Sequence, residues 1–332
     1  MDGKMKKLPK GFWWSVFGAL VVYFVMVLIG NAREFINSLA GFSWWLFGPI
    51  LLLSLANYNL RFLKWDYIMR CSSVNIKKSE NYRIFMAGLA GTISPGKSGE
   101  LIKPFLLLDR FQLPLERTIP VFFFERLTDF MGLILLSFIG IFLGRRDITS
   151  ALILSFFMIA ILFFLTNPLF WRLVFGLTGW NPKKGPFRMV YEISNNIQNF
   201  WRADVVFYTL FLTVLAWGAE CTGYYLVFKG FGGAESISII WAIFIYSAST
   251  ILGAITFVPG GLGITEGSLT GLAISVGKSK SIAISSTLII RAATLWFAVL
   301  LGILFLFKLQ QDRSSCAEPQ KNGVTNQLPR EG

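Results

Sequence analysis

The sequence predicts an all-α, polytopic membrane protein, and three observations lead to this fold class. Of the 332 residues, 54% are hydrophobic and 15% are charged, against about a quarter charged in soluble domains. The apolar residues form runs long enough to cross a bilayer, and two of these runs are interrupted by proline and glycine. Helices satisfy their own backbone hydrogen bonds in lipid, whereas a membrane β-barrel would show short alternating segments. We therefore expect about seven to eight helical spans.

The basic residues are assigned to loops rather than to nucleic-acid binding. The net charge is +13, and the Lys and Arg residues gather between the apolar runs, as expected of loops that face anionic headgroups. The cysteines, Cys71, Cys221 and Cys316, fit no zinc or disulfide spacing, and the chain has no His. Catalysis by His and metals held by His are therefore excluded, and we expect no cofactor.

The first half of the chain begins with lysines followed by an apolar run, Phe12–Gly30. We expect an uncleaved span with a cytoplasmic N-terminus, and a signal peptide is the alternative. A second span, Trp44–Leu60, precedes a stretch whose positive charges predict a cytoplasmic loop. Residues 84–108 are broken at their centre by Pro and Gly, which predicts a re-entrant or broken helix. Spans are expected at Thr118–Leu143 and Ser150–Thr166. The basic residues of the predicted loop are Arg61, Lys64, Arg70, Lys77, Lys78 and Arg83.

The second half contains a similar series of segments. Residues 169–204 are basic and expected to be cytoplasmic, with Phe170–Leu177 lying flat in the membrane interface. A second broken segment lies between the last two of the spans expected at Val205–Phe228, Ile237–Ile255 and Ile282–Phe307. Seven spans would place the basic tail outside, so an eighth crossing stays open. The expected parts are a cytoplasmic N-terminus, a transmembrane domain and a disordered tail, at 1–11, 12–308 and 309–332.

The two broken segments resemble each other and form an internal repeat. In each half an arginine within a span, Arg126 or Arg291, follows the last matched glycine by about 27 residues. Paired interruptions of this kind are the best sequence pointer to a transporter binding site. A broken helix exposes free N–H groups at membrane depth, and these attract anions such as a lipid phosphate. The alternative is that Gly and Pro only permit close packing. The matched residues are Pro95, Gly96, Lys97 and Gly99 in the first half and Pro259, Gly260, Gly261 and Gly263 in the second. A glutamate follows in each half, Glu100 directly after the last glycine and Glu266 slightly later.

Charged residues also lie inside otherwise apolar spans. Glu125 and Asp129 share one helix face at i,i+4, and Arg126 can reach Asp129 at i,i+3. Charges at this depth must be paired or face a polar cavity. They form either a structural salt-bridge cluster, with Arg291 as a further member, or a site for a headgroup or coupling ion.

Further polar residues accompany these clusters. Glu220 lies in the middle of a span with Tyr224 one turn later, and it is either a proton carrier or a packing residue that is protonated or paired with an Arg. Lys97 and Lys103 flank the first broken segment as phosphate ligands or as snorkelling residues. No Walker A motif is present, so we do not expect transport driven by ATP.

These motifs resemble the three signatures of the lysylphosphatidylglycerol synthase transmembrane-region family, also called the flippase-like domain family. The signatures are the Pro95–Glu100 segment, the Glu125–Asp129 segment and the Pro259–Gly263 segment with Glu266. Glu220 and Arg291 also fall where the family carries polar residues inside the membrane. Lys97 stands where the family often has Arg, and Lys is the weaker bidentate phosphate ligand.

The resemblance implies a multi-pass protein of a prokaryotic cytoplasmic membrane that translocates a lipid or lipid-linked substrate. In multiple peptide resistance factors, a flippase half of this kind is joined to a cytosolic domain that uses aminoacyl-tRNA. Residues 309–332 leave no room for that domain, so we expect no synthase activity.

The leading hypothesis is therefore flipping of an anionic or polyprenyl-linked lipid across the membrane. A membrane-embedded transferase, with Glu125 and Asp129 as a general-base pair, is the second hypothesis. A non-catalytic partner of a lipid or cell-envelope enzyme is the third. The expected partners are membrane lipids and no nucleic acid, with a second copy of the chain or an envelope-synthesis enzyme left open.

Overall fold

The computed structural model describes residues 10–29, 32–94, 98–144, 199–256 and 258–317. These residues are helical, with no β-strand among the described elements. The predicted fold class, a polytopic helical membrane protein, is confirmed. Within the described ranges, four helical segments are long and apolar enough to cross a membrane, namely Trp44–Cys71, Leu115–Leu143, Ala203–Phe231 and Lys280–Asp312. The expected span Ser150–Thr166 and the interfacial segment Phe170–Leu177 lie outside the described residues.

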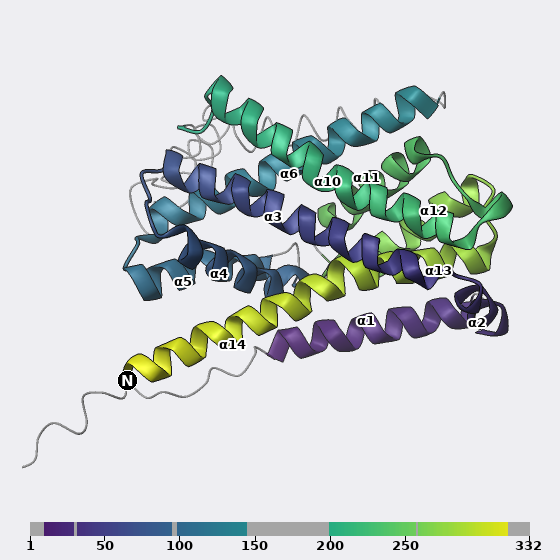
Figure 1. Ribbon diagram of the computed structural model, residues 1–332, viewed down its shortest axis with the longest axis horizontal. Helices are drawn as coiled ribbons and strands as arrows, with labels where there is room; N and C mark the ends of the chain where they lie inside the picture. Colours follow the sequence, from purple (N-terminus) through teal and green to yellow (C-terminus); the bar gives the residue numbers. More distant parts are fainter. Residues whose placement is uncertain (1–9, 30–31, 95–97, 145–198, 257, 318–332) are drawn as a thin grey trace, which may run out of the picture.

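Two long helices, α3 (Phe47–Cys71) and α10 (Ala203–Phe231), pack side by side in antiparallel directions (Figure 1). At one end the Ser43 N–H donates to the Gly230 carbonyl oxygen at 2.9 Å. At the other end the rings of Tyr67 and Tyr208 lie 4.6 Å apart. A third helix, α6 (Leu115–Gly144), packs against both. Short turns, η1 (Trp44–Leu46) and η4 (Gly233–Glu235), lie at the end where α10 finishes.

The first broken segment folds as a helical hairpin, which we call hairpin 1. Its first arm ends in a short turn, and its second arm starts from another, so the chain reverses direction inside the bundle. At the base of the hairpin, Arg110 pairs with Glu80 at 3.6 Å, and Arg83 pairs with Asp312 at 3.1 Å. The elements of hairpin 1 are α4 (Lys78–Gly88), η2 (Leu89–Ile93), η3 (Ser98–Leu101) and α5 (Ile102–Phe111).

A second hairpin, hairpin 2, consists of α11 (Ile239–Ile255) and α12 (Ile264–Ser275). The expected full span Ile237–Ile255 was wrong, because this helix is too short to count as a span and forms the first arm of the hairpin, while the second broken segment forms the tip and the second arm. Three glycines form its tip with positive φ angles, at Gly260 (+61°), Gly261 (+67°) and Gly263 (+81°). Residues with a side chain adopt such backbone angles only at a cost, so the reversal requires glycine. At the base, Lys278 Nζ donates to the Ala234 and Ser236 carbonyl oxygens at 2.7 and 2.9 Å.

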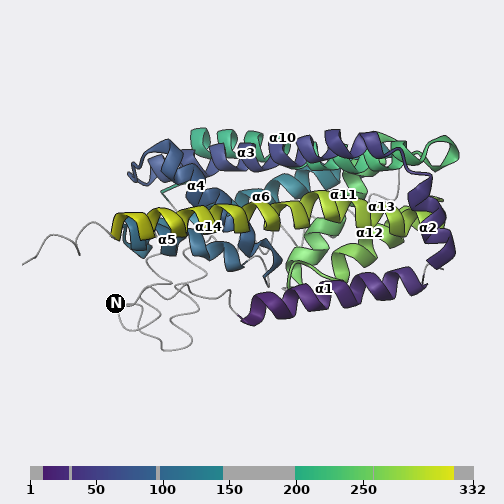
Figure 2. The same ribbon diagram turned by 60° about the horizontal axis from the view of Figure 1, so that its bottom comes forward.

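The two hairpins enter the bundle from opposite ends. The last span runs from Lys280 to Asp312, and the base of hairpin 1 lies by Asp312. The base of hairpin 2 lies by the other end, where the Ser279 N–H donates to Glu235 at 3.4 Å. Figures 1 and 2 both show α4 and α5 at one end and α12 and α13 at the other. We call these ends the Asp312 face and the Lys280 face. The internal repeat is therefore an inverted one, as in many transporters.

The last span is interrupted by a π-helix. It consists of α13 (Lys280–Arg291), the π-helix η5 (Ala292–Trp296) and α14 (Phe297–Ala317). The Tyr58 hydroxyl donates to the Thr294 carbonyl oxygen within this π-helix at 2.6 Å. One-turn π-helices often occur at functional sites, and this one follows directly after Arg291.

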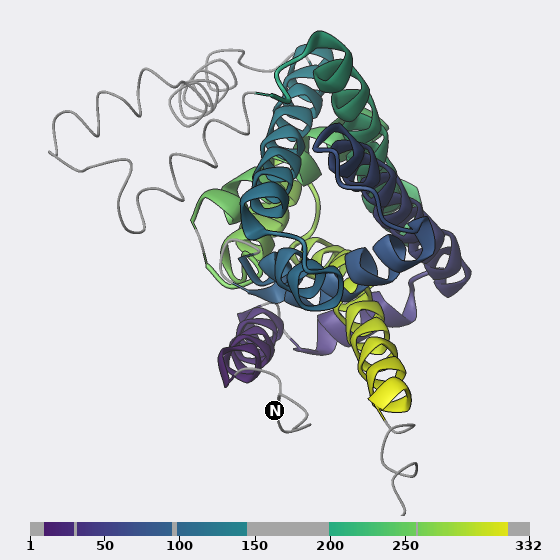
Figure 3. The ribbon, with the colours of Figure 1, turned by 90° about the vertical axis from the view of Figure 1, so that its left-hand side faces the viewer.

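The first helix, α1 (Lys10–Ile29), lies at the edge of the bundle (Figure 3). It is followed by α2 (Ala32–Ala40), and the segment Val16–Leu28 makes an angle of 97° with α2. The Tyr23 hydroxyl accepts a hydrogen bond from Trp296 Nε1 at 3.0 Å, which ties α1 to the π-helix. The predicted first span is therefore present as a helix, bent at its end.

Two sequence-predicted boundaries were wrong. The second span does not end at Leu60, because α3 continues to Cys71 and buries Arg61 and Lys64. The last span does not end at Phe307, because α14 continues to Ala317. Arg61 and Lys64 are stabilised inside the bundle by carboxylates of η3 and α6 that are distant in the sequence.

Candidate functional site

The first half of the bundle contains a buried cluster of charged side chains. Three acidic residues face four basic residues, and the most exposed of the side chains, Arg126, is only 13% exposed. The acidic members come from hairpin 1 and α6, and the basic members come from α3, α5 and α6. The members of this cluster, which we call the first-half cluster, are Arg61, Lys64, Lys103, Arg126, Glu100, Glu125 and Asp129.

Arg126 binds all three carboxylates of the first-half cluster. Its distances are 2.6 Å to Glu125, 3.1 Å to Asp129 and 3.4 Å to Glu100. The predicted contact between Arg126 and Asp129 is therefore confirmed. Arg61 approaches the same carboxylates from α3, at 3.2 Å from Glu100 and 3.6 Å from Glu125. The two arginines hold the tip of hairpin 1 against α3 and α6.

The two lysines of the cluster are fully buried. Lys64 Nζ donates to the Asp129 carboxylate, to Thr213 Oγ1 at 3.0 Å and to the Glu125 carbonyl oxygen at 3.3 Å. Lys103 Nζ lies 2.6 Å from Glu125 and 4.3 Å from the centre of the Trp65 ring. The snorkelling hypothesis for Lys103 was wrong, because its ammonium group is held inside the bundle by a carboxylate and aromatic rings.

The second half contains a simpler version of the same arrangement. Arg291 Nε donates to the Glu266 carboxylate at 2.6 Å, and its Nη2 donates to the Gly260 carbonyl oxygen at 2.7 Å. Glu266 in turn accepts a hydrogen bond from the Gly263 N–H at 2.7 Å. In both halves, an arginine therefore binds the glutamate of the neighbouring hairpin, as Arg126 does with Glu100. Arg291 is not part of the first-half cluster.

In the second half, the exposed helix N-terminus that the sequence predicted is capped by the protein itself. The carboxylate of Glu266 lies at the N-terminus of α12, where it accepts the Gly263 N–H. Negative charge at this end of a helix is favourable because the free N–H groups and the helix dipole are positive there. The N-terminus of α12 is therefore already occupied by a carboxylate, and Arg291 rather than this helix end is the group that the second half offers to an anion.

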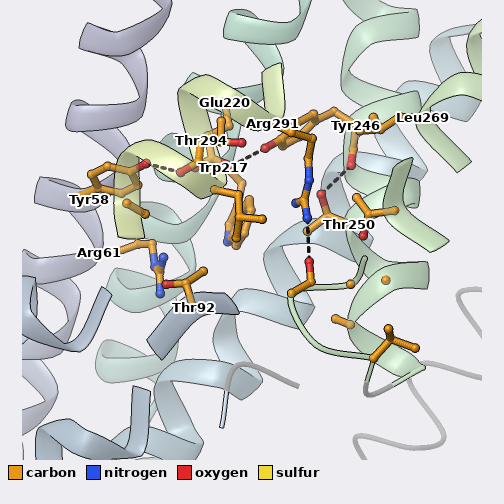
Figure 4. Close-up of a pocket in the computed structure, with 18 residues that line it drawn as sticks. Tyr58, Arg61, Thr92, Trp217, Glu220, Tyr246, Thr250, Leu269, Arg291 and Thr294 are labelled. Atoms are coloured by element: carbon orange, nitrogen blue, oxygen red, sulfur yellow. Dashed lines mark hydrogen bonds between the residues drawn. The ribbon is translucent and has the colours of Figure 1, made fainter. Parts of the chain in front are cut away.

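A cavity of about 60 Å³ lies between the two halves (Figure 4). Arg61 from α3 and Arg291 from α13 lie on opposite sides of it, and Glu220 from α10 completes its polar lining. The Tyr246 hydroxyl donates to Glu220 at 2.6 Å. The predicted neighbour Tyr224 is directed elsewhere, with its hydroxyl 3.5 Å from the Leu269 carbonyl oxygen. Gly260 and Gly261 of hairpin 2 also line the cavity.

The structure brings most of the sequence-predicted residues to this region. Gly99, Glu100, Lys103, Glu125, Arg126 and Asp129 gather in or beside the first-half cluster. Glu220, Pro259, Gly260, Gly261, Gly263, Glu266 and Arg291 gather around the cavity and hairpin 2. The predicted residues Pro95, Gly96 and Lys97 lie outside the described residues. Sequence reasoning missed Arg61 and Lys64, whose signal was a basic pair at i,i+3 directly after an apolar run.

Comparison with known proteins decides the family. The profile described as "Lysylphosphatidylglycerol synthase TM region" matches residues 14–302. The chain belongs to this family. The match covers both hairpins and every described residue of the cavity. The resemblance inferred from the motifs is therefore confirmed.

Relatives of this member of the lysylphosphatidylglycerol synthase transmembrane-region family occur in archaea. Two UPF0104 membrane proteins of Methanothermobacter thermautotrophicus are each 26% identical to the chain. One alignment covers 89% of this chain and 92% of the relative, and the other covers 73% and 78%. A UPF0104 membrane protein of Pyrococcus horikoshii is 32% identical over 30% of this chain and 29% of its own length.

Proposed function

We propose that this protein moves an anionic lipid, or an anionic lipid-linked amphiphile, across the cytoplasmic membrane. The observation that carries the proposal is the pair of inverted hairpins, each held at its tip by a buried arginine, with a polar cavity between them. Inverted repeats with sites at their interface are typical of secondary transporters. The proposal assigns no catalytic role to any residue.

The cavity favours an anionic substrate group. Arg61 and Arg291 lie on its two sides, and both guanidinium groups are always charged. A phosphate can accept hydrogen bonds from both, and arginine is well suited to phosphate recognition. The acyl or polyprenyl part of the substrate would remain in the surrounding lipid.

The cavity is small in the described conformation. Its volume of about 60 Å³ lies well below the roughly 300–1,000 Å³ of typical ligand pockets, so a lipid headgroup needs it to widen. Transport therefore requires the two hairpins to separate from each other, so that the cavity opens wider. Arg126 would stay with hairpin 1 while Arg291 stays with hairpin 2, so that each half moves as a unit.

The Asp312 face would be cytoplasmic. This face carries more of the basic residues, and positive charges mark the cytoplasmic side. Among the described residues, the basic residues of the Asp312 face include Arg70, Lys77, Lys78, Arg83, Arg110, Arg117, Arg202 and Lys308, and those of the Lys280 face include Arg33, Lys229, Lys278 and Lys280. The start of α1 and the end of α14 would then both lie on the cytoplasmic side.

The transferase hypothesis receives less support from the geometry. A general base must be able to take up a proton from the substrate. Glu125 is held by Lys103 and Arg126, each at 2.6 Å, and Asp129 is bound by Lys64 and Arg126. These contacts favour a structural role for both carboxylates.

Reconstitution into liposomes tests the proposal. The purified full chain would be inserted, and the transbilayer movement of fluorescent phosphatidylglycerol, phosphatidylcholine and a polyprenyl phosphate would be followed with and without a pH gradient. Arg291→Lys, Arg126→Ala and Glu125→Gln would run beside Arg70→Ala, which removes an exposed arginine of α3. We expect anionic lipids to move in the wild type and in Arg70→Ala.

Folding must be separated from transport in this assay. Arg291→Lys keeps the positive charge but loses the bidentate contact to Glu266 and Gly260, so it is the variant expected to fold and to transport more slowly. Normal folding of each variant would be checked by gel filtration and thermal unfolding in detergent.

Two results would overturn the proposal. One is lipid movement at the wild-type rate in a folded Arg126→Ala variant, and the other is no movement of any anionic lipid in the wild type.

A further inference from the structure

Within the described part of the chain, the charges of the first-half cluster, of the Arg291–Glu266 pair and of Glu220 sum to zero only when Glu220 is ionised. Among the described residues, the first-half cluster has four basic and three acidic side chains, and Arg291 with Glu266 adds one of each. Glu220 is the remaining acidic side chain that lines the cavity. With Glu220 charged, five acidic groups therefore balance five basic groups.

Addition of an anion to this balanced region leaves one uncompensated negative charge. A buried charge without a compensating partner is strongly disfavoured at membrane depth. The charge can be compensated if one carboxylate takes up a proton from water when the anion binds. We propose that Glu220 is this group, so that a phosphodiester anion binds between Arg61 and Arg291 together with one proton on Glu220. This inference rests on the proposed function.

The location of Glu220 distinguishes it from the other four acids. It lines the cavity directly and is only 5% exposed, whereas Glu266 is needed to cap α12 and to bind Arg291. A tyrosine hydroxyl both donates and accepts, so the contact to Tyr246 persists when Glu220 gains a proton. The titratable and charged groups that face Glu220 from the elements packed against it are Tyr58 and Arg61 of α3, Tyr246 of α11 and Arg291 of α13. Asp129 of α6 contacts Trp217, which lies one turn before Glu220.

A second observation indicates that the cavity takes a polar ligand. Thr92 of hairpin 1 lines it and is 6% exposed, and its Oγ1 has no hydrogen-bond partner in the part of the chain that the structure describes. Buried hydroxyl groups without a partner are rare in proteins. A phosphodiester oxygen beside Arg61 would accept a hydrogen bond from this hydroxyl. Figure 4 shows Thr92 and Arg61 on the same side of the cavity.

The test measures lipid affinity as a function of pH. Fluorescent phosphatidylglycerol is the probe, because its single phosphodiester charge does not change between about pH 5 and pH 9. It would be titrated into the purified full chain in nanodiscs of phosphatidylcholine. The coupling predicts that Kd rises about tenfold for each pH unit once the pH exceeds the pKa of Glu220 in the ligand-free protein, because binding then requires proton uptake.

Glu220→Gln resembles the protonated acid and should bind the probe with the low-pH affinity at every pH. Glu116→Gln, which removes an exposed carboxylate of α6, should keep the wild-type pH dependence. Proton uptake on binding, measured by calorimetry in two buffers of different ionisation enthalpy, should be about one per lipid in the wild type and absent in Glu220→Gln. Thr92→Val should weaken binding at every pH.

The results that would overturn the role of Glu220 differ from those that would overturn the proposed function. Saturable binding with a Kd that does not depend on pH, or proton uptake that persists in Glu220→Gln, would overturn the role of Glu220 and leave the proposed function intact. If Glu220→Gln does not fold, the pH dependence is measured instead on Glu220→Asp, which keeps a titratable group. A lack of saturable binding at every pH would overturn the proposed function and this inference together.

Discussion

The Gly260 N–H donates a hydrogen bond to the Ser94 carbonyl oxygen at 3.2 Å, and this bond joins the tips of the two hairpins. The Gly260 carbonyl oxygen at the same time accepts from Arg291. A single residue of hairpin 2, Gly260, therefore connects the second-half arginine to hairpin 1. Any movement that opens the cavity between the halves has to break this contact.

The first prediction concerns this contact between the tips. A Cβ atom placed on Gly260 would lie 3.5 Å from the Cα atom of Ile93, which is compatible with disulfide geometry. In a variant with Cys71, Cys221 and Cys316 replaced by Ser, the pair Ile93→Cys and Gly260→Cys should form a disulfide. Oxidation should stop lipid movement in liposomes, and reduction should restore it.

Each single cysteine variant serves as the control for the pair, because oxidation should not change its rate. Gly260 has a positive φ, so Gly260→Cys alone is expected to be less stable than the parent. If a fully cross-linked protein moved lipid as fast as the same variant with its disulfide reduced, the tips would not need to separate.

The second prediction separates two lysines of the same basic stretch. Lys64 is fully buried against Asp129, whereas Lys78 is exposed at the start of α4. Removal of one partner of a buried ion pair costs about 3–5 kcal/mol, so Lys64→Met should lower the unfolding temperature markedly. Lys78→Met should change the free energy of unfolding by less than about 0.5 kcal/mol. Thermal unfolding in detergent measures both, and equal stabilities would contradict the burial of Lys64.

The third prediction concerns the packing of α14 on hairpin 1. A Cβ atom on Gly302 would lie only 2.0 Å from the Ala90 backbone nitrogen, so Gly302→Ala should destabilise the protein by about 1–3 kcal/mol or more. Gly218 of α10 has open space around it, and Gly218→Ala should be neutral or stabilise the helix by up to about 1 kcal/mol. The same unfolding assay compares the two, and tolerance of Gly302→Ala would argue against this close approach.

The fourth prediction concerns orientation in the membrane. Cys71 is exposed on the Asp312 face and Cys221 is buried. In a variant with Cys316 replaced by Ser, a maleimide that cannot cross the membrane should label Cys71 in inside-out vesicles and not in intact cells. Lys278→Cys on the opposite face, in a background with Cys71 replaced by Ser, should show the reverse. Labelling of Cys71 from outside would invert the assigned orientation.

Much of the fold could be predicted because the bilayer constrains local patterns. Apolar length located α6 and α10 closely, and Pro and Gly at regular places in the two halves located both hairpins. The end of α3 could not be found in this way. Rules that place positive charge in loops misassign Arg61 and Lys64, because the carboxylates that stabilise them come from residues about 40 to 65 positions later in the chain.

The parts of the candidate site that belong to the internal repeat could be predicted from the sequence. The matched positions of Arg126 and Arg291 identified the two arginines, and each binds a glutamate of the neighbouring hairpin. The partner of Glu220 was not predictable, because Tyr246 lies on another helix and helical spacing favoured Tyr224. Contacts within one helix can be derived from spacing, whereas contacts between helices depend on packing that the spacing does not encode.

The balance of charges around the cavity has a consequence for energetics. A full charge that crosses a bilayer gains or loses about 2.3 kcal/mol for each 100 mV of membrane potential. With Glu220 ionised, the five acidic and five basic groups described above contribute no net charge in that field. An anionic headgroup that travels with the proton on Glu220 is equally insensitive to voltage. Lipid movement would then be electroneutral, driven by the pH difference and by lipid asymmetry, and it would continue in a depolarised membrane.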